Sequence, residues 1–427
     1  MNNYLTRSLG DIVTNHDSTR VPLSSRERDQ FRGSFPYYGA AGVIDFVQDY
    51  LFDGMYILIA EDGSVVTSAN MPVVQLVRGK FWVNNHAHII RAETEADTEY
   101  IYYALSTVNV LPYLSGSVQP KLTQASMNSI PIPYPDEPIR TTIAHILGTL
   151  DDKIEFNRRM NETLEGIAGA LFKSWFIDFD PVRAKAEGRQ PFGMNEETAA
   201  LFPSEFEDSE LGEIPKGWSV RKLSDICTTQ YGYTTSAKRA TEGPRLLRVT
   251  DINKRDYIVW DEVPYCIVPE EKMRKYELRK GDVVVARMAD PGKAAIIDDD
   301  VPAIFASYLV RLRANTLVEN YYIYGFLKSD LYQQYSEEVK SGSVQANMNA
   351  KIIVGCKLVI PDSRIIELYY SIVKHLRGRI AANVTNSSML REVRDALLPK
   401  LMSGEIRVDP LKFGFGAGSE EKKAEGA

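Results

Sequence analysis

The sequence predicts an α+β protein in which two α/β domains are separated by two long antiparallel coiled-coil helices, with an internal pseudo-twofold repeat. Two observations lead to this fold class. The segment SGSVQ occurs twice, at 115–119 and at 341–345, a shift of 226. Each copy is followed by a long stretch in which apolar residues recur at spacings of three and four, the pattern of a helix that packs on another helix.

Three further pairs of segments repeat in the same order, which is hard to explain by chance. Their shift drifts between 214 and 227, as expected if loops differ in length between two related domains. The pairs are LGDI (9–12) with LSDI (223–226), GMYILIA (54–60) with GDVVVA (281–286), and YIYY (100–103) with YIYG (322–325).

The order of segments along the chain is globular, helix, globular, helix. Short β-rich runs such as PVVQLV (72–77) and helical segments such as EYIYYALS (99–106) make each globular part a mixed domain. The predicted boundaries are domain 1 at 1–140, central helix 1 at 141–178, a linker at 179–211, domain 2 at 212–364, central helix 2 at 365–404 and a flexible tail at 405–427.

The two helical stretches keep one heptad register at the shift of 226. They share a polar position, Asn157 in the first and Asn383 in the second, and a polar seam residue fixes register. We therefore expect the helices to pack on each other, the alternative being two unrelated amphipathic helices on separate cores. The predicted seam consists of Leu147, Leu150, Ile154, Asn157, Leu164 and Leu171 with Val373, Leu376, Ile380, Asn383, Leu390 and Leu397.

Composition restricts the class of protein without naming a function. The 427 residues are 44% hydrophobic and 25% charged, as in ordinary globular domains. No run of eighteen apolar residues and no signal peptide is present, so we expect a cytoplasmic protein without a membrane partner. The net charge of −7 leaves DNA binding open, because binding depends on where the basic residues lie.

The cysteines and histidines predict no metal site. Cys227, Cys266 and Cys356 are widely spaced and form no CxxC pair, so neither a disulfide framework nor a zinc site is indicated. His86 and His88 would share one face of a strand, which allows metal binding as an alternative, but no third ligand is evident.

These features together resemble the specificity subunit of Type I restriction–modification enzymes. The resemblance covers about residues 4–405 and rests on the ordered recurrence of the Leu-x-Asp-Ile openings and the GSVQ segments. The first half departs from the pattern, since it lacks the IPxGW lead-in of the second half and starts at Tyr4. The further matching motifs are LFKSWFIDFDPVRAK (171–185), GEIPKGW (212–218) and LLPKLMSGEIRV (397–408).

The resemblance implies a chain that is not itself an enzyme and holds no cofactor. Each domain would be a target-recognition domain that reads one half of a bipartite, asymmetric sequence in double-stranded DNA. The helices would set the gap between the halves and dock two methyltransferase subunits, through which restriction subunits join. Adenine-N6 DNA methyltransferase and ATP-dependent endonuclease activities, with S-adenosylmethionine, Mg²⁺ and ATP, are expected in those partner subunits.

Helix length agrees with such a spacing role. A helix over residues 143–176 would be on the order of 50 Å long at about 1.5 Å per residue. That length corresponds to about fifteen base pairs at about 3.4 Å per pair. An antiparallel helix pair also has a pseudo-twofold axis, which suits two similar partner subunits.

Residues expected to contact DNA are cationic, amide and aromatic side chains in loops, since phosphates and base edges are bound by such groups. The GSVQ segments are favoured because glycine and serine let the backbone approach a phosphate, although a structural role in joining domain to helix is an alternative. For any single residue the alternative is a solvated surface side chain. The candidates are Arg20, Tyr37, Tyr38, Lys80, Gln119 and Lys121 in domain 1, and Lys238, Arg239, Arg248, Arg287, Lys293, Gln345 and Lys351 in domain 2.

The end of central helix 1 is more apolar than a two-helix seam can bury. We therefore predict a subunit-docking surface there, and packing against the following spacer is the alternative. The residues of this predicted surface are Phe172, Trp175, Phe176 and Phe179.

Two other functions are weighed against DNA recognition. A DNA methyltransferase would carry a [DN]PP[YF] signature, but DPV at 180–182 and DPG at 290–292 lack it. GK at 292–293 lacks the spacing of a P-loop, and Glu338-x-Lys340 matches only half of a nuclease motif. The remaining alternative is a protein-only scaffold with two β-rich ligand-binding domains on a coiled-coil spacer.

Overall fold

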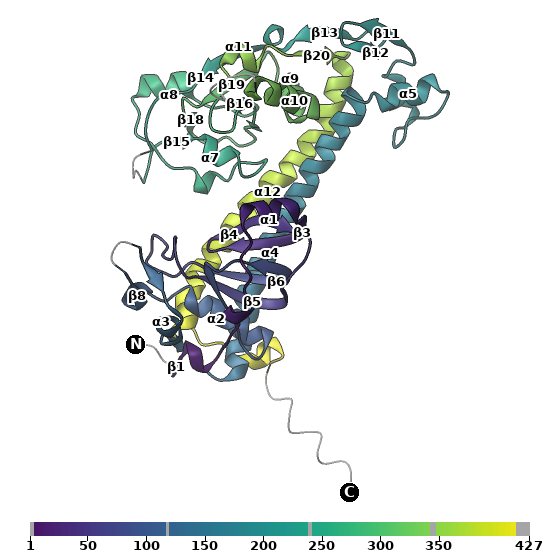
Figure 1. Cartoon of the computed structure of the whole chain (residues 1–427). Helices are drawn as coiled ribbons and strands as arrows, with labels where there is room; N and C mark the ends of the chain where they lie inside the picture. The colour runs from purple at the N-terminus through teal and green to yellow at the C-terminus, as the bar shows by residue number, and fades with distance from the viewer. Residues whose placement is uncertain (1–3, 117–118, 238–240, 342–346, 416–427) are drawn as a thin grey trace. The chain divides into compact units, whose positions relative to one another are not determined.

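The computed structural model describes residues 4–116, 119–237, 241–341 and 347–415. Its chain divides into two compact units, which can be followed by colour in Figure 1. Unit 1 comprises Met1–Ile154 and Met389–Ala427, and unit 2 comprises Glu155–Ser388. Within the described ranges, no helix is both long and apolar enough to cross a membrane.

Unit 1 is built on a six-stranded sheet in the order β2-β7-β5-β6-β3-β4. β5 is antiparallel to both of its neighbours and is buried along most of its length, and α2 packs against β5 and β6. The strands are β1 (Thr6–Ser8), β2 (Thr14–Asn15), β3 (Arg32–Gly39), β4 (Gly42–Val47), β5 (Phe52–Ala60), β6 (Val74–Val83), β7 (Ala87–Arg91), β8 (Leu114–Ser115), β9 (Lys121–Leu122) and β10 (Pro131–Pro133). The helices are η1 (Leu9–Asp11), η2 (Asp17–Thr19), α1 (Ser25–Gln30), α2 (Glu95–Leu105), η3 (Leu111–Tyr113), α3 (Gln124–Asn128) and η6 (Pro410–Phe413).

Unit 2 is built on a four-stranded antiparallel sheet in the order β14-β19-β16-β17, which α9 covers. Its strands are β11 (Phe206–Ser209), β12 (Gly212–Pro215), β13 (Ser219–Lys222), β14 (Cys227–Tyr231), β15 (Arg245–Leu247), β16 (Val283–Ala286), β17 (Ala294–Ile296), β18 (Ala303–Phe305), β19 (Leu309–Ala314) and β20 (Lys357–Ile360). Its helices are α5 (Asp180–Ala186), α6 (Glu196–Ala200), η4 (Leu223–Asp225), α7 (Val249–Ile252), η5 (Trp260–Glu262), α8 (Glu270–Tyr276), α9 (Leu317–Lys328), α10 (Asp330–Ser341) and α11 (Ala350–Ile353).

The repeat found in the sequence is a repeat of strand register. β1 pairs β10 with Arg7 opposite Ile132, and β13 pairs β20 with Arg221 opposite Leu358. These partners are related by shifts of 214 and 226, the same shifts that relate the sequence landmarks. Both units therefore close the same strand pair with equivalent residues.

A buried tyrosine in each unit repeats one hydrogen bond. The Tyr100 hydroxyl on α2 donates to the Pro133 carbonyl at 2.7 Å, and the Tyr322 hydroxyl on α9 donates to the Val359 carbonyl. The two acceptors are again separated by 226 residues. The YIYY and YIYG landmarks thus mark helices that attach to the sheet strand at the same point.

Two 40-residue helices, α4 (Glu137–Phe176) and α12 (Ser363–Met402), contribute to both units. Within unit 2, Asn157 donates to Asn386 Oδ1 at 2.9 Å and Ser387 Oγ at 3.1 Å, and Asn383 donates to Asn161 Oδ1 at 2.8 Å. The residue numbers of the contacting side chains rise along α4 as they fall along α12, so the two helices are antiparallel. Asn157 with Asn383, and Asn161 with Ser387, are each separated by 226 residues, so the internal repeat relates the two polar contacts.

The remaining predicted seam residues lie on inward faces of the two helices. Leu147 packs in the core of unit 1, and Leu164, Leu171, Val373, Leu376 and Ile380 pack in clusters of unit 2. Leu150, Ile154, Leu390 and Leu397 are half-buried. Within unit 2 the polar layer is thus followed along both helices by apolar contacts.

Two predicted boundaries differ from the structure. The segment predicted as a linker, 179–211, contains α5, α6 and part of the β11–β12 hairpin, and Phe179, Val182 and Phe202 are buried in the core of unit 2. In the segment predicted as a flexible tail, 405–427, residues up to 415 are described and include η6, while Ile406 and Val408 pack on the core of unit 1. Both segments follow a long helix and cover the apolar end of that helix.

The long helices also begin earlier than predicted, at Glu137 rather than 141 and at Ser363 rather than 365. Pro138 lies in the first turn of α4, where the missing N–H of a proline is not needed by the helix.

Candidate nucleic-acid interface

We call the two SGSVQ segments, 115–119 and 341–345, the reading segments, because the sequence predicts that they contact DNA. The first begins at β8, in a short hairpin of unit 1. β8 and β9 pair with Ser115 opposite Lys121, and Gln119 between them is exposed. Residues 117–118 lie outside the described residues, as do 342–346 of the second segment, including the predicted Gln345. The site is therefore built from the framework that flanks these segments.

Two equivalent positions, Glu61 and Arg287, directly follow the central strands β5 and β16. Each residue makes the same two backbone hydrogen bonds. Its amide donates to the residue immediately before the paired strand, β7 or β19, and its carbonyl accepts from the residue three positions after the reading segment. In unit 1 these are Glu61 N to His86 O at 2.9 Å and Leu122 N to Glu61 O at 3.0 Å. In unit 2 they are Arg287 N to Tyr308 O and Met348 N to Arg287 O, both at 2.9 Å.

In unit 1 this position belongs to a closed ionic cluster. His88 is 2% exposed and is held between Asp17 Oδ2, 2.5 Å from Nδ1, and the Leu122 carbonyl, 2.7 Å from Nε2. Arg20 donates to Glu61 Oε2 at 2.8 Å. Both imidazole nitrogens face acceptors, so the doubly protonated ring satisfies the site. Burial opposes that charge, but the bonds to Asp17 and Leu122 raise the pKa of His88 above its ordinary value.

Three further charged or titratable side chains, Asp62, His86 and Lys121, lie next to this cluster. Asp62 lies 2.8 Å from His86 Nδ1 and 3.8 Å from Lys121 Nζ. Lys121 is half-exposed, and an exposed pair of this length is weak, so the Lys121 ammonium is still available to a phosphate. The two histidines therefore hold different carboxylates, and among the described residues no group of three or more His, Cys, Asp or Glu side chains is placed to hold a metal.

In unit 2 the equivalent residue, Arg287, has no carboxylate partner among the described residues. The Arg287 guanidinium lies over the Tyr231 ring, with Cζ 5.1 Å from the ring centroid, and Arg287 Nε is buried without a hydrogen-bond partner. Tyr231 occupies the position of Asp17, because β14 and β19 pair Tyr231 with Val310 in the register that places Asp17 beside His88. The Tyr231 hydroxyl accepts from Ala350 N at 2.9 Å. Sequence reasoning did not single out Tyr231, since only the strand register identifies it.

The other candidates of unit 1 differ in their availability. Tyr37 is 1% exposed, and its hydroxyl accepts from Leu23 N at 2.9 Å, so the prediction that it contacts DNA is wrong. Arg20 is largely covered by its pairs within the ionic cluster. Tyr38 is half-buried against Phe81. Lys80 is exposed, with Nζ 4.4 Å from the centroid of the Tyr50 ring.

The other candidates of unit 2 are mostly paired. Arg248 makes a bidentate bond to Asp251 at 2.7 and 2.9 Å, and Lys293 contacts Asp256 at 2.9 Å. Lys351 is exposed on α11. Lys238 and Arg239 lie outside the described residues. Of the candidates that the structure describes in unit 2, Arg287 and Lys351 are the cations without a carboxylate partner.

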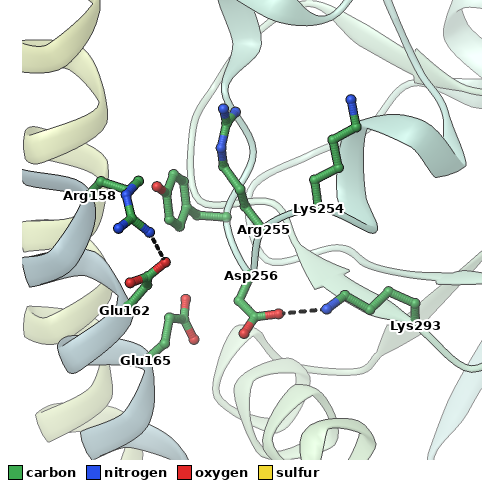
Figure 2. Close-up of a pocket in the computed structure, with 8 residues that line it drawn as sticks. Arg158, Glu162, Glu165, Lys254, Arg255, Asp256 and Lys293 are labelled. Atoms are coloured by element: carbon green, nitrogen blue, oxygen red, sulfur yellow. Dashed lines mark hydrogen bonds and ion pairs between the residues drawn. The ribbon is translucent and has the colours of Figure 1, made fainter. Parts of the chain in front are cut away.

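Lys293 lines a polar cavity of about 240 Å³ beside α4, which Figure 2 shows. Arg158 pairs with Glu162 on the helix side, and Asp256 pairs with Lys293 on the opposite side. Glu165 points into the cavity between them. The lining holds four cations and three carboxylates, and Arg158, Arg255 and Lys293 are each paired with a carboxylate. The cavity is therefore better suited to join segments of unit 2 than to hold a phosphate.

A fully buried arginine joins the same segments. Arg377 on α12 donates to Asp298 at 2.8 Å, pairs with Glu165 on α4 and lies over the Tyr324 ring of α9. Its side chain is 2% exposed. Burial, together with Asp256 and the Asp298 carboxylate, raises the pKa of Glu165 to about 7, although Arg377 opposes this shift. Sequence reasoning did not find this cluster, because Glu165, Asp298 and Arg377 are between 79 and 212 residues apart in the chain.

The predicted subunit-docking surface is corrected by the structure. Phe172, Trp175, Phe176 and Phe179 are between 1% and 7% exposed and form part of the core of unit 2. Phe176 contacts Trp218, with ring centroids 6.2 Å apart. These aromatic side chains are enclosed by the segment that follows α4 and by domain 2, which is close to the alternative of packing against the spacer.

Comparison with known proteins agrees with this architecture. A family model described as the Type I restriction modification DNA specificity domain matches twice, at residues 1–166 and 215–383. The chain is 29% identical over 366 residues to the Type I restriction enzyme MjaIX specificity subunit of Methanocaldococcus jannaschii, covering 82% of this chain and 79% of the relative. It is 26% identical over 329 residues to the HindI specificity subunit of Haemophilus influenzae, covering 67% and 71%.

A solved structure shares the fold. The S subunit of a Type I restriction–modification system from M. genitalium superposes with a TM-score of 0.54 at 14% identity, over 94% of this chain and 96% of the other. The two matches of the family model fall one on each half of the internal repeat.

Proposed function

Because the chain belongs to the family of Type I restriction–modification DNA specificity subunits, we propose that its two units each read one block of a bipartite, asymmetric target in duplex DNA. The observation that carries this proposal is the pair of equivalent positions Glu61 and Arg287. They share a backbone framework beside the two reading segments and differ in charge. A shared framework with different side chains suits two readers of different blocks.

The helix pair is proposed as the spacer and as the docking surface for two methyltransferase subunits, through which restriction subunits join. The antiparallel arrangement and the repeated polar contacts around Asn157 and Asn383 support two similar docking surfaces. Since the aromatic end of α4 is buried, docking falls to the solvent-exposed faces of α4 and α12. S-adenosylmethionine, ATP and Mg²⁺ are proposed to belong to these partner subunits, with S-adenosylmethionine in the methyltransferase.

The test is to map methylated adenines in DNA from cells that carry the complete system. The proposal predicts a motif of two short, different blocks separated by a fixed gap. A continuous palindrome would contradict two readers. Binding of the assembled complex to that motif should also weaken steeply with salt, as phosphate contacts require; a complex that binds no DNA specifically would favour a scaffold for protein ligands.

A further inference from the structure

We infer that Arg287, held by Tyr231, is the residue with which unit 2 reads a guanine in its block of the target. The inference rests on the proposed function and adds to it the residue, the base and the unit. Its starting point is an unusual state of a cation, because Arg287 has no carboxylate partner among the described residues while Arg248 and Lys293 each have one.

The Arg287 side chain is fixed in place before any ligand arrives. Its backbone is bonded on both sides, to the Tyr308 carbonyl and from the Met348 amide. Its guanidinium lies over the Tyr231 ring, and the Tyr231 hydroxyl is itself held by the Ala350 amide. An arginine that is oriented in this way loses less side-chain entropy when it binds.

The guanidinium of Arg287 has unused donors. Nε is buried and makes no hydrogen bond, and no bond of either Nη group to a described residue is present. With Nε covered, the two Nη groups form the end of the planar fork that a ligand can reach. A planar fork of two donors matches a pair of acceptors, as on the O6 and N7 edge of guanine or on a phosphate.

The repeat decides between a base and a phosphate. A residue that binds the DNA backbone has the same task in both halves of the target, whereas a residue that reads a base need not. The position of Arg287 is Glu61 in unit 1, and a carboxylate does not bind phosphate. Glu61 is moreover neutralised by Arg20 at 2.8 Å, so unit 1 has no equivalent donor at this position. The chemistry at this position is therefore specific to one half.

The test uses the full chain assembled with its methyltransferase and duplexes that carry the mapped target. Each base pair of the two blocks is substituted in turn, and affinity is measured at several salt concentrations for the wild type, Arg287→Gln and Arg287→Lys. Arg279→Gln serves as the matched control, because Arg279 is an exposed arginine of unit 2 with its own partner, Glu277, at 3.3 Å.

The expected result is confined to one base pair. The wild type should prefer guanine there by about 5- to 150-fold, and Arg287→Gln should lose that preference while every preference in the other block remains. Arg287→Lys, which keeps the charge without the planar fork, should keep the salt dependence and lose most of the preference. Arg279→Gln should behave as the wild type, and the melting temperatures of all variants report folding.

Two results would overturn the inference. A uniform loss for all sequences, with the salt dependence reduced by about one phosphate contact, would make Arg287 a phosphate ligand. Unchanged base preferences in a folded Arg287→Gln complex would remove Arg287 from recognition altogether. Failure of the proposed function is a different outcome, because the wild-type complex itself would then show no preference for the split target.

Discussion

The positions of Glu61 in unit 1 and Arg287 in unit 2 are the same in backbone and opposite in chemistry. Both follow a central strand and make matching hydrogen bonds of 2.9 to 3.0 Å beside a reading segment. In unit 1 Glu61 accepts a hydrogen bond from Arg20, and the neighbouring Asp17 and His88 side chains pair with each other. In unit 2 it holds an arginine stacked on Tyr231 without a carboxylate.

The difference teaches how one backbone framework can carry two different side-chain chemistries. Hydrogen bonds between backbone groups do not depend on the side chain, so they hold the framework constant while the side chains change. Contacts that need particular side chains are then free to diverge. The following predictions test whether the framework is equivalent in the two units and the side-chain clusters are not.

The largest expected effect is at the helix ends that close the two cores. Phe176 packs on Trp218 and Tyr322 in unit 2, whereas the equivalent residue of unit 1, 226 positions later, is Met402. Phe176→Ala should destabilise unit 2 by about 3–5 kcal/mol and Met402→Ala should destabilise unit 1 by about 2–5 kcal/mol. Hydrogen exchange of the α9 and α2 amides measures each unit separately. Equal loss in both units from either variant would contradict separate cores.

The next effect concerns the buried charges beside α12. Arg377→Met leaves Glu165 and Asp298 without their cation and should destabilise unit 2 by about 3–5 kcal/mol. The equivalent residue of unit 1 is Asp151, which is partly exposed and pairs with Arg394 at 2.5 Å. Asp151→Asn should cost only about 1 kcal/mol.

A double variant provides the control for Arg377. Adding Glu165→Gln removes one stranded carboxylate and should recover part of the loss in the same hydrogen-exchange measurement. If Arg377→Met alone cost no more than Asp151→Asn, the buried cluster would not be what holds these segments of unit 2 together.

The framework itself should respond equally in both units. Tyr100→Phe and Tyr322→Phe each remove a hydrogen bond from a buried hydroxyl to an equivalent carbonyl, of Pro133 and Val359. Each should cost about 1 kcal/mol in its own unit. Thermal unfolding of the two variants gives the comparison, and a clearly larger loss in one of them would show that the frameworks are not equivalent.

The smallest effect is the pH dependence that His88 gives to unit 1. The pKa of His88 is raised in the folded protein, so its contribution to stability is complete below its ordinary value of 6.5 and is lost as pH rises through the raised pKa. The slope is at most about 1.4 kcal/mol per pH unit for one proton. Hydrogen exchange of β7 amides against pH measures it, and His88→Gln should abolish the slope.

Unit 2 supplies the reference for this titration. Val310 occupies the position of His88. Unit 2 titrates through Glu165 instead, whose raised pKa makes unit 2 lose stability as pH rises from 4.5 to about 7. The β19 amides should therefore show no further change above pH 7, where that of unit 1 continues. A slope of the same size in both units would mean that another group titrates.

Sequence periodicity predicted the helix pair and the repeat because both depend on residues close in sequence or on matching order. The positions around Asn157 could be read from heptad spacing, and the landmarks fixed which segments correspond. Burial of Tyr37 and of the aromatic end of α4 could not be read in this way. It depends on which distant segment covers a side chain, as Trp218 covers Phe176.

The sequence could not predict which cations of the candidate interface are paired with carboxylates. Arg20, Arg248, Lys293 and Arg287 are alike in sequence, each a cation in a loop or at a turn. Arg20, Arg248 and Lys293 have carboxylate partners in the structure. Two of the partners, Asp17 and Asp251, lie within five residues of their cations, whereas Glu61 and Asp256 are distant in sequence. That Arg287 has no carboxylate partner among the described residues can be found only from the positions of the strands that flank it.

The most direct test of the central claim is to lengthen the helix pair and map DNA methylation again. One heptad inserted into both α4 and α12 adds about 10 Å to each helix, which corresponds to about three base pairs. Two independent readers joined by a spacer predict that the gap in the methylated motif grows by about three base pairs while both blocks stay the same. An unchanged gap, or an altered sequence in either block, would contradict that account.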